Sequence, residues 1–261
     1  MNIVIGKNSQ LAQYVDKLDT IFWSANEVDT ETAKKADKIY FFFCEQRTFL
    51  QLPEEDYMHV NVTLTMELLT KLYNEKTDFY IYGSGDLWNN CEGGVTIDTP
   101  INYKYSPYLK SKHILTEYVL DFIHEKNATN IHLIHPFNFN TPYRKEGFLF
   151  YKIFDSIIYK KKITTGNLNF MRDIVHPNFI LFRSQYTRRT SLVGSGNPVN
   201  IKEFVSKLYS HFDMNIHDYL TEDKAATTVH SSFFYHKTKI RYNNLLEDTI
   251  NDITKFKNKA C

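Results

Sequence analysis

The amino-acid sequence predicts an α/β protein built on a parallel sheet with helices on both faces. Short apolar segments alternate with segments in which apolar residues recur at helical spacing, and this alternation is typical of crossover connections between parallel strands. Segments such as "KIYFFF" (38–43) are nearly continuous apolar runs, which suits strands buried on both faces. The 261 residues are enough for one large domain, or for one domain with a smaller lobe.

The individual elements follow from the same two patterns. Strands are expected over the apolar runs at 2–6, 19–24, 38–43, 78–84, 130–139 and 192–196. Helices are expected where apolar residues recur every three or four positions, at 9–18, 61–75, 108–126, 147–162, 200–212 and 245–257. Asn200 is a good helix-opening residue, so the helix over 200–212 is expected to begin there. Ligands of open parallel sheets bind beyond the carboxyl ends of the strands, so the residues following these strands should line one cleft.

Composition excludes several classes of protein. The net charge of +1 gives no electrostatic footprint for nucleic acid. No apolar run is long enough to span a membrane, and the N-terminus lacks the pattern of a signal peptide. Cys44, Cys91 and Cys261 are odd in number and far apart, which predicts neither a disulfide framework nor a metal site. We therefore expect a cytoplasmic protein that binds no metal, no membrane and no nucleic acid.

The first strand leads into a candidate phosphate-binding loop, "GKNSQLA" (6–12). Small residues recur every third position, at Gly6, Ser9 and Ala12, and small residues let backbone N–H groups approach a pyrophosphate. The residues expected to contact a dinucleotide here are Gly6, Lys7, Ser9, Gln10 and Leu11. A tight strand-to-helix turn with no ligand is the alternative interpretation.

Lys7 and Glu27 bear on the choice of cofactor. An acid that binds the adenosine ribose should follow the loop by about 20 residues, and Glu27 lies slightly beyond the end of the second strand. Lys7 lies inside the loop, where its ammonium can meet a 2′-phosphate. This favours NADP over NAD, and a solvated Lys7 is the alternative.

Tyr108 and Lys112 form a candidate proton-donating pair. The spacing of four places both side chains on one face of a helix. A nearby ammonium lowers the pKa of a phenol from its usual value of about 10, so Tyr108 becomes a candidate acid for reduction of a carbonyl. Ser84 ends the strand over 78–84 and can hold the carbonyl oxygen. Tyr235 and Lys239 repeat the spacing, but they lie in an extended segment, where such positions are roughly 13 Å apart.

Eight segments in this order resemble the extended short-chain dehydrogenase/reductase family, the nucleotide-sugar epimerases, dehydratases and reductases. They are "GKNSQLA", whose form is similar to the glycine loop of dTDP-4-dehydrorhamnose reductases, "ADKIYFFFCE", "VNVTLTMELL", "SGDLW", "YLKSK", "HPFNFNTP", "GNLNFMRDIVHP" and "LVGSGNPVNIKEF". The sequence departs from the family pattern at two loop glycines, at Phe43 and Cys44 in place of small residues beside the cofactor, and at His135 in place of an arginine.

The resemblance implies a Rossmann-like doubly wound sheet with a small C-terminal substrate-binding lobe. It divides the chain into an NAD(P)-binding domain over 1–145 and a region over 146–261 that is mainly the lobe, interleaved with the last elements of the sheet. It implies catalytic roles for Ser84, Tyr108 and Lys112, and adds cofactor contacts from Phe43, Tyr108 and Lys112. Ser84, Asn138 and Arg172 would contact the substrate. Asn138 as a turn residue, and Arg172 paired with Asp173, are the alternatives.

The function implied is NAD(P)H-dependent reduction of a keto group on a nucleotide-linked or phosphorylated sugar, in the synthesis of surface-polysaccharide precursors. An epimerase that retains NAD is one alternative, and a non-enzymatic NAD(P) sensor or scaffold is another. Dehydration is disfavoured, because relatives that dehydrate commonly carry an Asp-Glu pair after the serine, whereas here Asp86 is one residue off that position and the Glu is missing. Asn61 is expected to be structural, holding a helix bend or a water, and His176 is expected to pack or cap near Pro177. Relatives often dimerise through the Tyr–Lys helix, so the resemblance also implies a homodimer.

Overall fold

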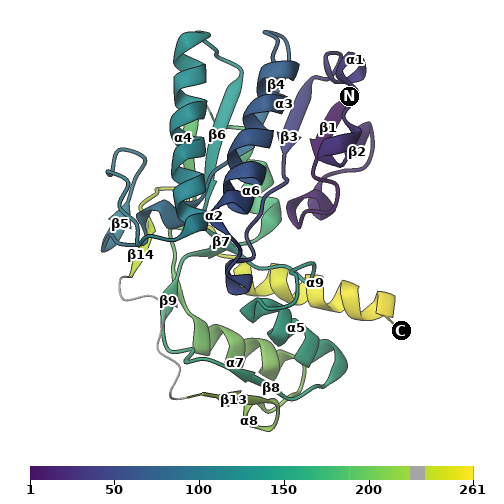
Figure 1. The fold of residues 1–261 in the computed structure, drawn as a ribbon. Coiled ribbons are helices and arrows are strands. Elements are labelled where there is room, and N and C mark those ends of the chain that lie inside the picture. The colour runs from purple at the N-terminus through teal and green to yellow at the C-terminus, as the bar shows by residue number, and fades with distance from the viewer. Residues whose placement is uncertain (188, 224–232, 261) are drawn as a thin grey trace.

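The central sheet contains six parallel strands (Figure 1). The computed structural model describes residues 1–187, 189–223 and 233–260. Residues 259 and 260 are described through their backbone alone, and Cys261 lies outside the described residues. In chain order the strands are β1 (Asn2–Ile5), β2 (Thr20–Trp23), β3 (Lys38–Phe41), β4 (Asp78–Tyr82), β6 (Ile131–Pro136) and β11 (Thr190–Val193). Their spatial order is β11-β6-β4-β3-β1-β2. The strand order reverses between β1 and β3, which is where such sheets bind their ligands.

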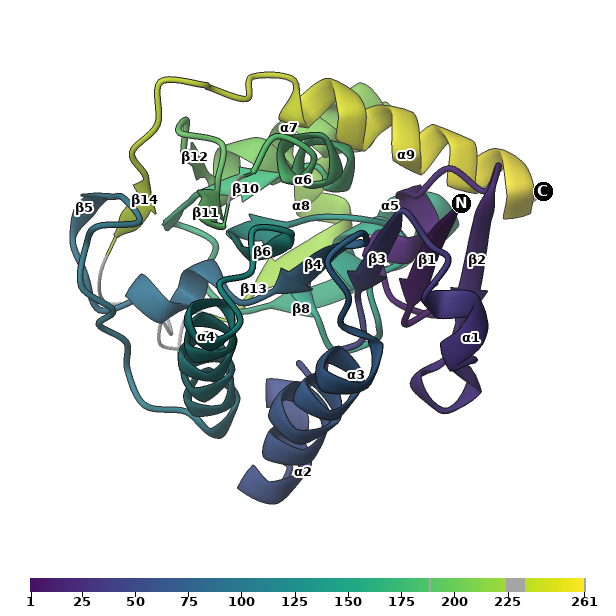
Figure 2. The ribbon, with the colours of Figure 1, turned by 90° about the horizontal axis from the view of Figure 1, so that it is seen from above.

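Helices cover both faces of the sheet, as Figure 2 shows from above. One face carries α2 (Glu54–Met58), α3 (Leu64–Leu72) and α4 (Pro107–Glu125), with the short α1 (Thr30–Ala33) near the edge. The other face carries α6 (Pro177–Ser184) and α9 (Leu245–Ala260). This arrangement confirms the predicted α/β fold with a Rossmann-like, doubly wound parallel sheet. No helix in the described ranges is long and apolar enough to cross a membrane.

A smaller group of elements lies below the sheet in Figure 1. It contains α5 (Leu149–Tyr159), α7 (Ile201–His211), α8 (Ile216–Tyr219) and the paired strands β8 (Ile163–Thr165) and β13 (Leu220–Glu222). Three further strand pairs join distant segments: β7 (Asn138–Phe139) with β10 (Ile174–Val175), β9 (Met171–Arg172) with β12 (Val199–Asn200), and β5 (Gly93–Val95) with β14 (Phe234–His236). The division at residues 145 and 146 stays a prediction.

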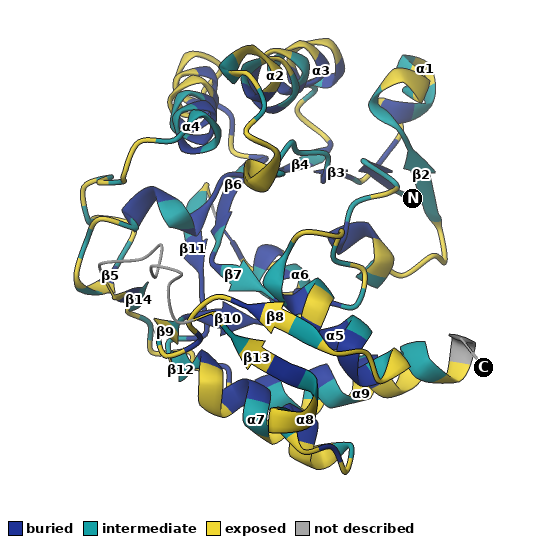
Figure 3. Cartoon of the chain, turned by 60° about the horizontal axis from the view of Figure 1, so that its bottom comes forward, coloured by how far each residue is buried: buried dark blue, intermediate teal, exposed yellow. Residues whose placement is uncertain are grey.

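Alternate strand residues feed two separate cores, since side chains of a strand point to opposite faces in turn. Ile3, Ile39 and Phe79 pack in the cluster formed with α3 and α4. Tyr40 and Tyr80 face the opposite cluster, formed with α5, α6, α7 and α9, and their rings stack 4.7 Å apart. Figure 3 shows the central strands β3, β4 and β6 as mostly buried, which explains why their sequences are nearly continuous apolar runs.

The helix predicted over 9–18 is wrong. The structure has only a 3₁₀ turn at Leu11–Tyr14, and the chain is extended again at Val15. The Tyr14 hydroxyl donates to Asp252 on α9 and hydrogen-bonds to Thr141 at 2.8 Å. These long-range contacts hold Tyr14 in place, and such tertiary contacts routinely override local helix propensity.

The other predicted elements are present with shifted ends. The helix predicted over 61–75 begins earlier, at Glu54, and passes through a π turn at His59–Thr63 between α2 and α3. Asn200 opens α7 as predicted, because its side chain accepts the Glu203 N–H at 3.1 Å. The sequence analysis missed α6, although His176 does cap it and Pro177 occupies its first turn.

Candidate active site

A cavity of about 750 Å³ lies beyond the carboxyl ends of the central strands. Its wall contains nearly all the residues predicted to act at a site: Ser9, Gln10, Leu11, Phe43, Ser84, Tyr108, Lys112, Asn138 and Arg172. These residues come from the loop after β1, the ends of β3 and β4, the start of α4, and β7 and β9. Gly6 and Lys7 are not part of the wall. The expected cleft therefore exists, and we call it the main cleft.

Ser84 and Tyr108 meet in the main cleft. Ser84 follows β4 and opens a short 3₁₀ turn, where its Oγ accepts the Asp86 N–H at 3.2 Å. Tyr108 lies in the first turn of α4, which Ser106 caps by accepting the Leu109 N–H at 3.1 Å. The Ser84 hydroxyl lies near enough to the Tyr108 phenol to act on its pKa, which it lowers. A carbonyl oxygen placed between these two hydroxyls would therefore have two donors.

The pKa of Tyr108 is raised well above its ordinary value, chiefly because the phenol is removed from water, with Cys44 and Asp86 raising it further. The Ser84 hydroxyl and the Arg144 guanidinium act in the opposite direction and lower the pKa of Tyr108. The net raising of the pKa is opposite to the lowering that we predicted from Lys112. Tyr108 therefore stays protonated near neutral pH, which is the form that a proton donor requires.

Lys112 lies one turn after Tyr108 and is buried. Its Nζ donates to the Tyr82 carbonyl oxygen at 2.8 Å, at the end of β4. One of the three ammonium donors is thus used by the backbone. This contact fixes the start of α4 against the end of β4, just before Ser84.

Tyr235 and Lys239 have a different setting. Tyr235 lies in β14, opposite Gly94 of β5, and does not line the main cleft. Lys239 follows beyond the strand and is exposed. The interpretation of this second pair as part of an extended segment is confirmed.

Gly6 shapes the loop after β1. Its φ of +107° lies in the region that favours glycine, and a Cβ at this position would lie 2.4 Å from the Phe43 backbone nitrogen. The loop then closes on itself, because the Ser9 N–H donates to the Gly6 carbonyl oxygen at 2.8 Å. Gly6 therefore supports the loop, while Ser9, Gln10 and Leu11 face the main cleft.

Lys7 has a partner that the sequence analysis did not assign to it. Its Nζ lies 2.7 Å from the Glu27 carboxylate, which also accepts the Ser24 N–H at 2.7 Å. The hydrogen bond from Lys7 is the main reason that the pKa of Glu27 is lowered. The charge of Lys7 is therefore already balanced at the end of β2.

Asn138 and Arg172 lie where the main cleft adjoins a second cavity of about 310 Å³. The second cavity has aromatic and aliphatic walls, formed by Phe139, Phe148, Leu149, Phe150, Leu168, Phe170, Ile174 and Ile201. Asp173 accepts hydrogen bonds from Ser195 and His236, which accounts for the burial of its carboxylate. Asn138 and Arg172 therefore lie at the entrance of this second cavity, which we call the apolar slot. Polar side chains beside an apolar cavity are typical of sites for amphipathic ligands.

Two charged residues of the main cleft were missed as site residues. Arg144 follows β7 and lies between the rings of Phe139 and Phe148, at 5.2 and 4.4 Å from their centroids. Asp86 is half-buried and one of its carboxylate oxygens is buried with no hydrogen-bond partner among the described residues. Neither has a spacing motif. The one signal available was that each follows a strand end.

Asn61 and His135 support the site from beneath. Asn61 lies in the π turn and is buried. Its side chain accepts the Glu45 N–H and donates to the Glu45 carbonyl oxygen and to the Ser111 hydroxyl. This is the helix-bend role that we expected. His135 Nδ1 accepts the Ser84 N–H at 3.3 Å, so the imidazole helps to place the backbone of Ser84.

His135 is expected to make the protein less stable in acid. Burial lowers the pKa of His135 to about 3, whereas an unfolded histidine titrates near 6.5. The stability present above pH 6.5 is therefore lost as the pH falls toward 3, by about 2 kcal/mol at pH 5. Urea unfolding at pH 7.5 and pH 5 measures this loss. His135→Gln should remove about 2 kcal/mol of the pH dependence, and an unchanged dependence would contradict the assignment.

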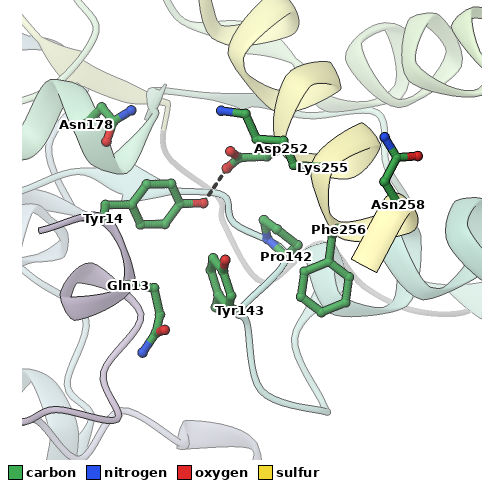
Figure 4. A pocket seen from close by; sticks show the side chains of 9 residues that line it. All are labelled: Gln13, Tyr14, Pro142, Tyr143, Asn178, Asp252, Lys255, Phe256 and Asn258. Atoms are coloured by element: carbon green, nitrogen blue, oxygen red, sulfur yellow. Dashed lines mark hydrogen bonds between the residues drawn. The ribbon is translucent and has the colours of Figure 1, made fainter. Parts of the chain in front are cut away.

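A separate cavity of about 470 Å³ lies between the 3₁₀ turn, the loop after β7 and α9 (Figure 4). The sticks in Figure 4 show the Tyr14 side chain pointing to Asp252. The Asp252 carboxylate also hydrogen-bonds to His176 Nε2 at 2.9 Å. Burial and the Asp252 carboxylate hold the pKa of Tyr14 far above its usual range. None of the predicted site residues lines this cavity, and its hydrogen bonds serve to fasten α9 to the loop after β1.

Several solved structures of other proteins share this architecture. The chain is similar to RMD from Pseudomonas aeruginosa complexed with NADPH (12% identity, TM-score 0.78, 99% of each chain covered). It is also similar to UDP-glucose 4-epimerase from Thermotoga maritima with UDP-glucose (14% identity, TM-score 0.79, 100% of each chain). A third similar structure is dTDP-glucose 4,6-dehydratase from Streptomyces venezuelae with NAD bound (12% identity, TM-score 0.77, 99% of this chain and 98% of that one). At these identities the likeness establishes the fold.

The family of this chain is established by its match to a protein-family model, and not by the similar structures. A search of curated protein sequences returned no match. The family model described as GDP-mannose 4,6 dehydratase matches residues 34–260. The chain therefore belongs to this family of nucleotide-sugar dehydratases, epimerases and reductases, and is an NAD(P)-dependent enzyme of the extended short-chain dehydrogenase/reductase type.

Proposed function

We propose that this chain reduces a keto group on a nucleotide-linked or phosphorylated sugar. The observation that carries the proposal is that Ser84, Lys112 and a Tyr108 phenol that stays protonated at neutral pH line one cleft. In this proposal Ser84 holds the carbonyl oxygen, and Tyr108 Oη gives its proton to that oxygen as negative charge develops. Lys112 braces the start of α4 and offers its remaining donors toward the cofactor ribose. The nicotinamide dinucleotide supplies the hydride.

The shape of the main cleft supports this use. The loop residues Ser9, Gln10 and Leu11 line the main cleft, and Asn138 and Arg172 line both the main cleft and the apolar slot. The loop residues fit a dinucleotide, and Asn138 and Arg172 fit a nucleotide carrying phosphate groups, because arginine binds phosphate through charge-assisted hydrogen bonds. Similar proteins have NADPH, NAD and UDP-glucose bound, as their descriptions say.

The direct test is loss of NADH or NADPH absorbance in the presence of keto-sugar nucleotides and ketose phosphates. Multiple turnovers with exchange of the cofactor would support the reductase. Tightly retained NAD, with interconversion of sugar epimers and no net oxidation, would support the epimerase instead. Failure of the purified chain to bind either dinucleotide would contradict both.

Dehydration is a second candidate, because the structure places Asp86 in the same cleft. Its unpartnered buried oxygen lies close enough to raise the pKa of Tyr108, and a carboxylate in that state can remove a proton from carbon. Solvent deuterium appearing in the sugar product, and its loss in Asp86→Asn, would favour this activity. Reduction without such exchange would leave Asp86 a purely electrostatic role.

We further propose that the cofactor is NAD(H). Glu27 stands at the end of β2 with Lys7 held against it, and a carboxylate there accepts hydrogen bonds from the adenosine ribose but repels a 2′-phosphate. The preference for NADP that we inferred from Lys7 alone did not include this ion pair.

Glu27→Ala is expected to shift the ratio of NADH to NADPH affinity toward NADPH by about tenfold, since an arriving phosphate can then pair with Lys7. Fluorescence titration with both dinucleotides measures the ratio. Glu31→Ala, at an exposed carboxylate on α1, is the matched control and should leave it unchanged. A ratio that Glu27→Ala does not alter would remove this basis for NAD preference.

A further inference from the structure

The loop after β1 lacks the helix that usually follows a dinucleotide-binding loop. A diphosphate in that position is ordinarily met by the positive end of a helix and its N–H groups. Here the loop leads into one 3₁₀ turn, Leu11–Tyr14, and then into extended chain. The diphosphate charge must therefore be met in part by other groups.

Gln10 and Arg144 provide a polar pair at this point of the main cleft. Arg144 Nη1 donates to Gln10 Oε1 at 3.2 Å, which joins the loop after β1 to the loop after β7. Gln10 Nε2 and Arg144 Nε are both buried and have no hydrogen-bond partner in the described part of the chain. Both atoms are donors, and buried donors without an acceptor cost free energy. What this pair lacks is an acceptor, and phosphate oxygens are strong acceptors.

Arg144 keeps its charge in this setting. Burial lowers its pKa to about 10, and the Tyr108 and Asp86 groups oppose that lowering. Its guanidinium lies against the rings of Phe139 and Phe148, which leave its edges to make the hydrogen bonds. The group is therefore a cation at neutral pH.

The two loops are fastened together on their far side. Tyr14 ends the 3₁₀ turn that begins next to Gln10, and Thr141 precedes Arg144 by three residues. The Tyr14 hydroxyl bonds to both Thr141 and Asp252, and its ring contacts Tyr143 edge-on (Figure 4). Gln10 and Arg144 are thus held in register before any ligand arrives.

We propose that the side chains of Gln10 and Arg144 bind the diphosphate of the dinucleotide cofactor, in place of the missing helix end. This inference rests on the proposed function, since it assumes a dinucleotide in the main cleft. The diphosphate of a nucleotide-linked substrate has the same chemistry. The cofactor is the assigned source because Gln10 belongs to the loop after β1, beside the point where the strand order reverses, and shares that loop with Ser9 and Leu11.

The first test measures binding of ADP-ribose, which contains the diphosphate and both riboses but no nicotinamide, by calorimetry. Arg144→Gln is expected to weaken ADP-ribose and NADH by about 10- to 100-fold, as for loss of a charged hydrogen-bond donor. Arg144→Lys should recover part of the affinity. Lys145→Gln changes the next residue, an exposed cation of the same loop, and should leave binding unchanged.

A second variant separates ligand binding from structural support. Gln10→Glu keeps the size of the side chain and strengthens its contact with Arg144, so the free protein should unfold at an equal or higher urea concentration. The added negative charge opposes a diphosphate, so ADP-ribose affinity should fall by at least tenfold. A purely structural pair would instead leave affinity unchanged or improved.

The results of these experiments separate failure of this inference from failure of the proposed function. Normal ADP-ribose affinity in both Arg144→Gln and Gln10→Glu would overturn the inference while the proposed function stands. Weakened UDP, GDP and dTDP with unchanged ADP-ribose would also overturn it, and would assign the pair to the substrate. Failure of the unmodified chain to bind ADP-ribose or NADH would overturn the proposed function and this inference together.

Discussion

Tyr108→Phe is expected to lower turnover by about 10²- to 10⁴-fold, the usual contribution of a positioned acid. The variant keeps the ring and its edge-on contact with Tyr57, so the fold should be retained. Steady-state kinetics with a keto-sugar nucleotide measures the effect. Since Tyr108 is held protonated, with its pKa well above 10, the normal enzyme should show no loss of rate from this group up to about pH 9.

Tyr235→Phe is the matched control, because Tyr235 also precedes a lysine by four residues but lies in β14 outside the main cleft. It should leave turnover almost unchanged. Equal losses in the two variants would contradict the choice of Tyr108. A rate that falls between pH 7 and 9, and does so only while Tyr108 is present, would contradict the raised pKa of Tyr108.

Asp173→Ala is expected to lower the free energy of unfolding by about 3 to 6 kcal/mol, without any direct part in the chemistry. The Asp173 carboxylate is 1% exposed. It accepts the Ser195 N–H at 2.6 Å, the Ser195 hydroxyl at 2.7 Å and the His236 N–H at 2.8 Å. Removing it leaves buried donors without acceptors, each costing about 1 to 3 kcal/mol. Urea unfolding followed by circular dichroism measures the loss.

Asp121→Ala provides the comparison, since Asp121 is an exposed carboxylate on α4. Its effect should stay within about 0.5 kcal/mol. Asp173→Asn should lie closer to Asp173→Ala than to the normal protein, because an amide has one acceptor oxygen for three donors. If Asp173→Ala were no more harmful than Asp121→Ala, the three hydrogen bonds would not be a significant source of stability.

The pair Tyr108 and Lys112 could be predicted because both side chains depend on one helix. Spacing of four residues on a helix sets their relative positions before any tertiary contact forms. Ser84 could be added because it ends a buried strand, and parallel strands end at a common edge. The direction of the Tyr108 pKa could not be predicted, because it depends on burial by segments far away in the sequence and on Lys112 turning to the Tyr82 carbonyl oxygen.

The roles of Lys7 and Arg144 show the same limit near the loop after β1. Lys7 looked like a phosphate ligand within its loop, but β2 brings Glu27 against it from 20 residues away. Arg144 has no motif, and it reaches Gln10 across 134 residues. The helix expected over 9–18 fails for a related reason, since Tyr14 is held by Asp252 near the C-terminus.

The sequence by itself determined the sheet, most of the helices and the family, and it predicted Ser84, Tyr108 and Lys112, which the fold brings into one cleft. These depend on periodicity and short spacings, which neighbouring residues settle through backbone geometry. Only the tertiary structure decided that Lys7 pairs with Glu27, that Arg144 donates to Gln10, and that the Asp86 carboxylate raises the pKa of the Tyr108 phenol. Charges and hydrogen bonds act over a few ångströms in space, and folding brings together residues whose separation along the chain carries no information about that distance.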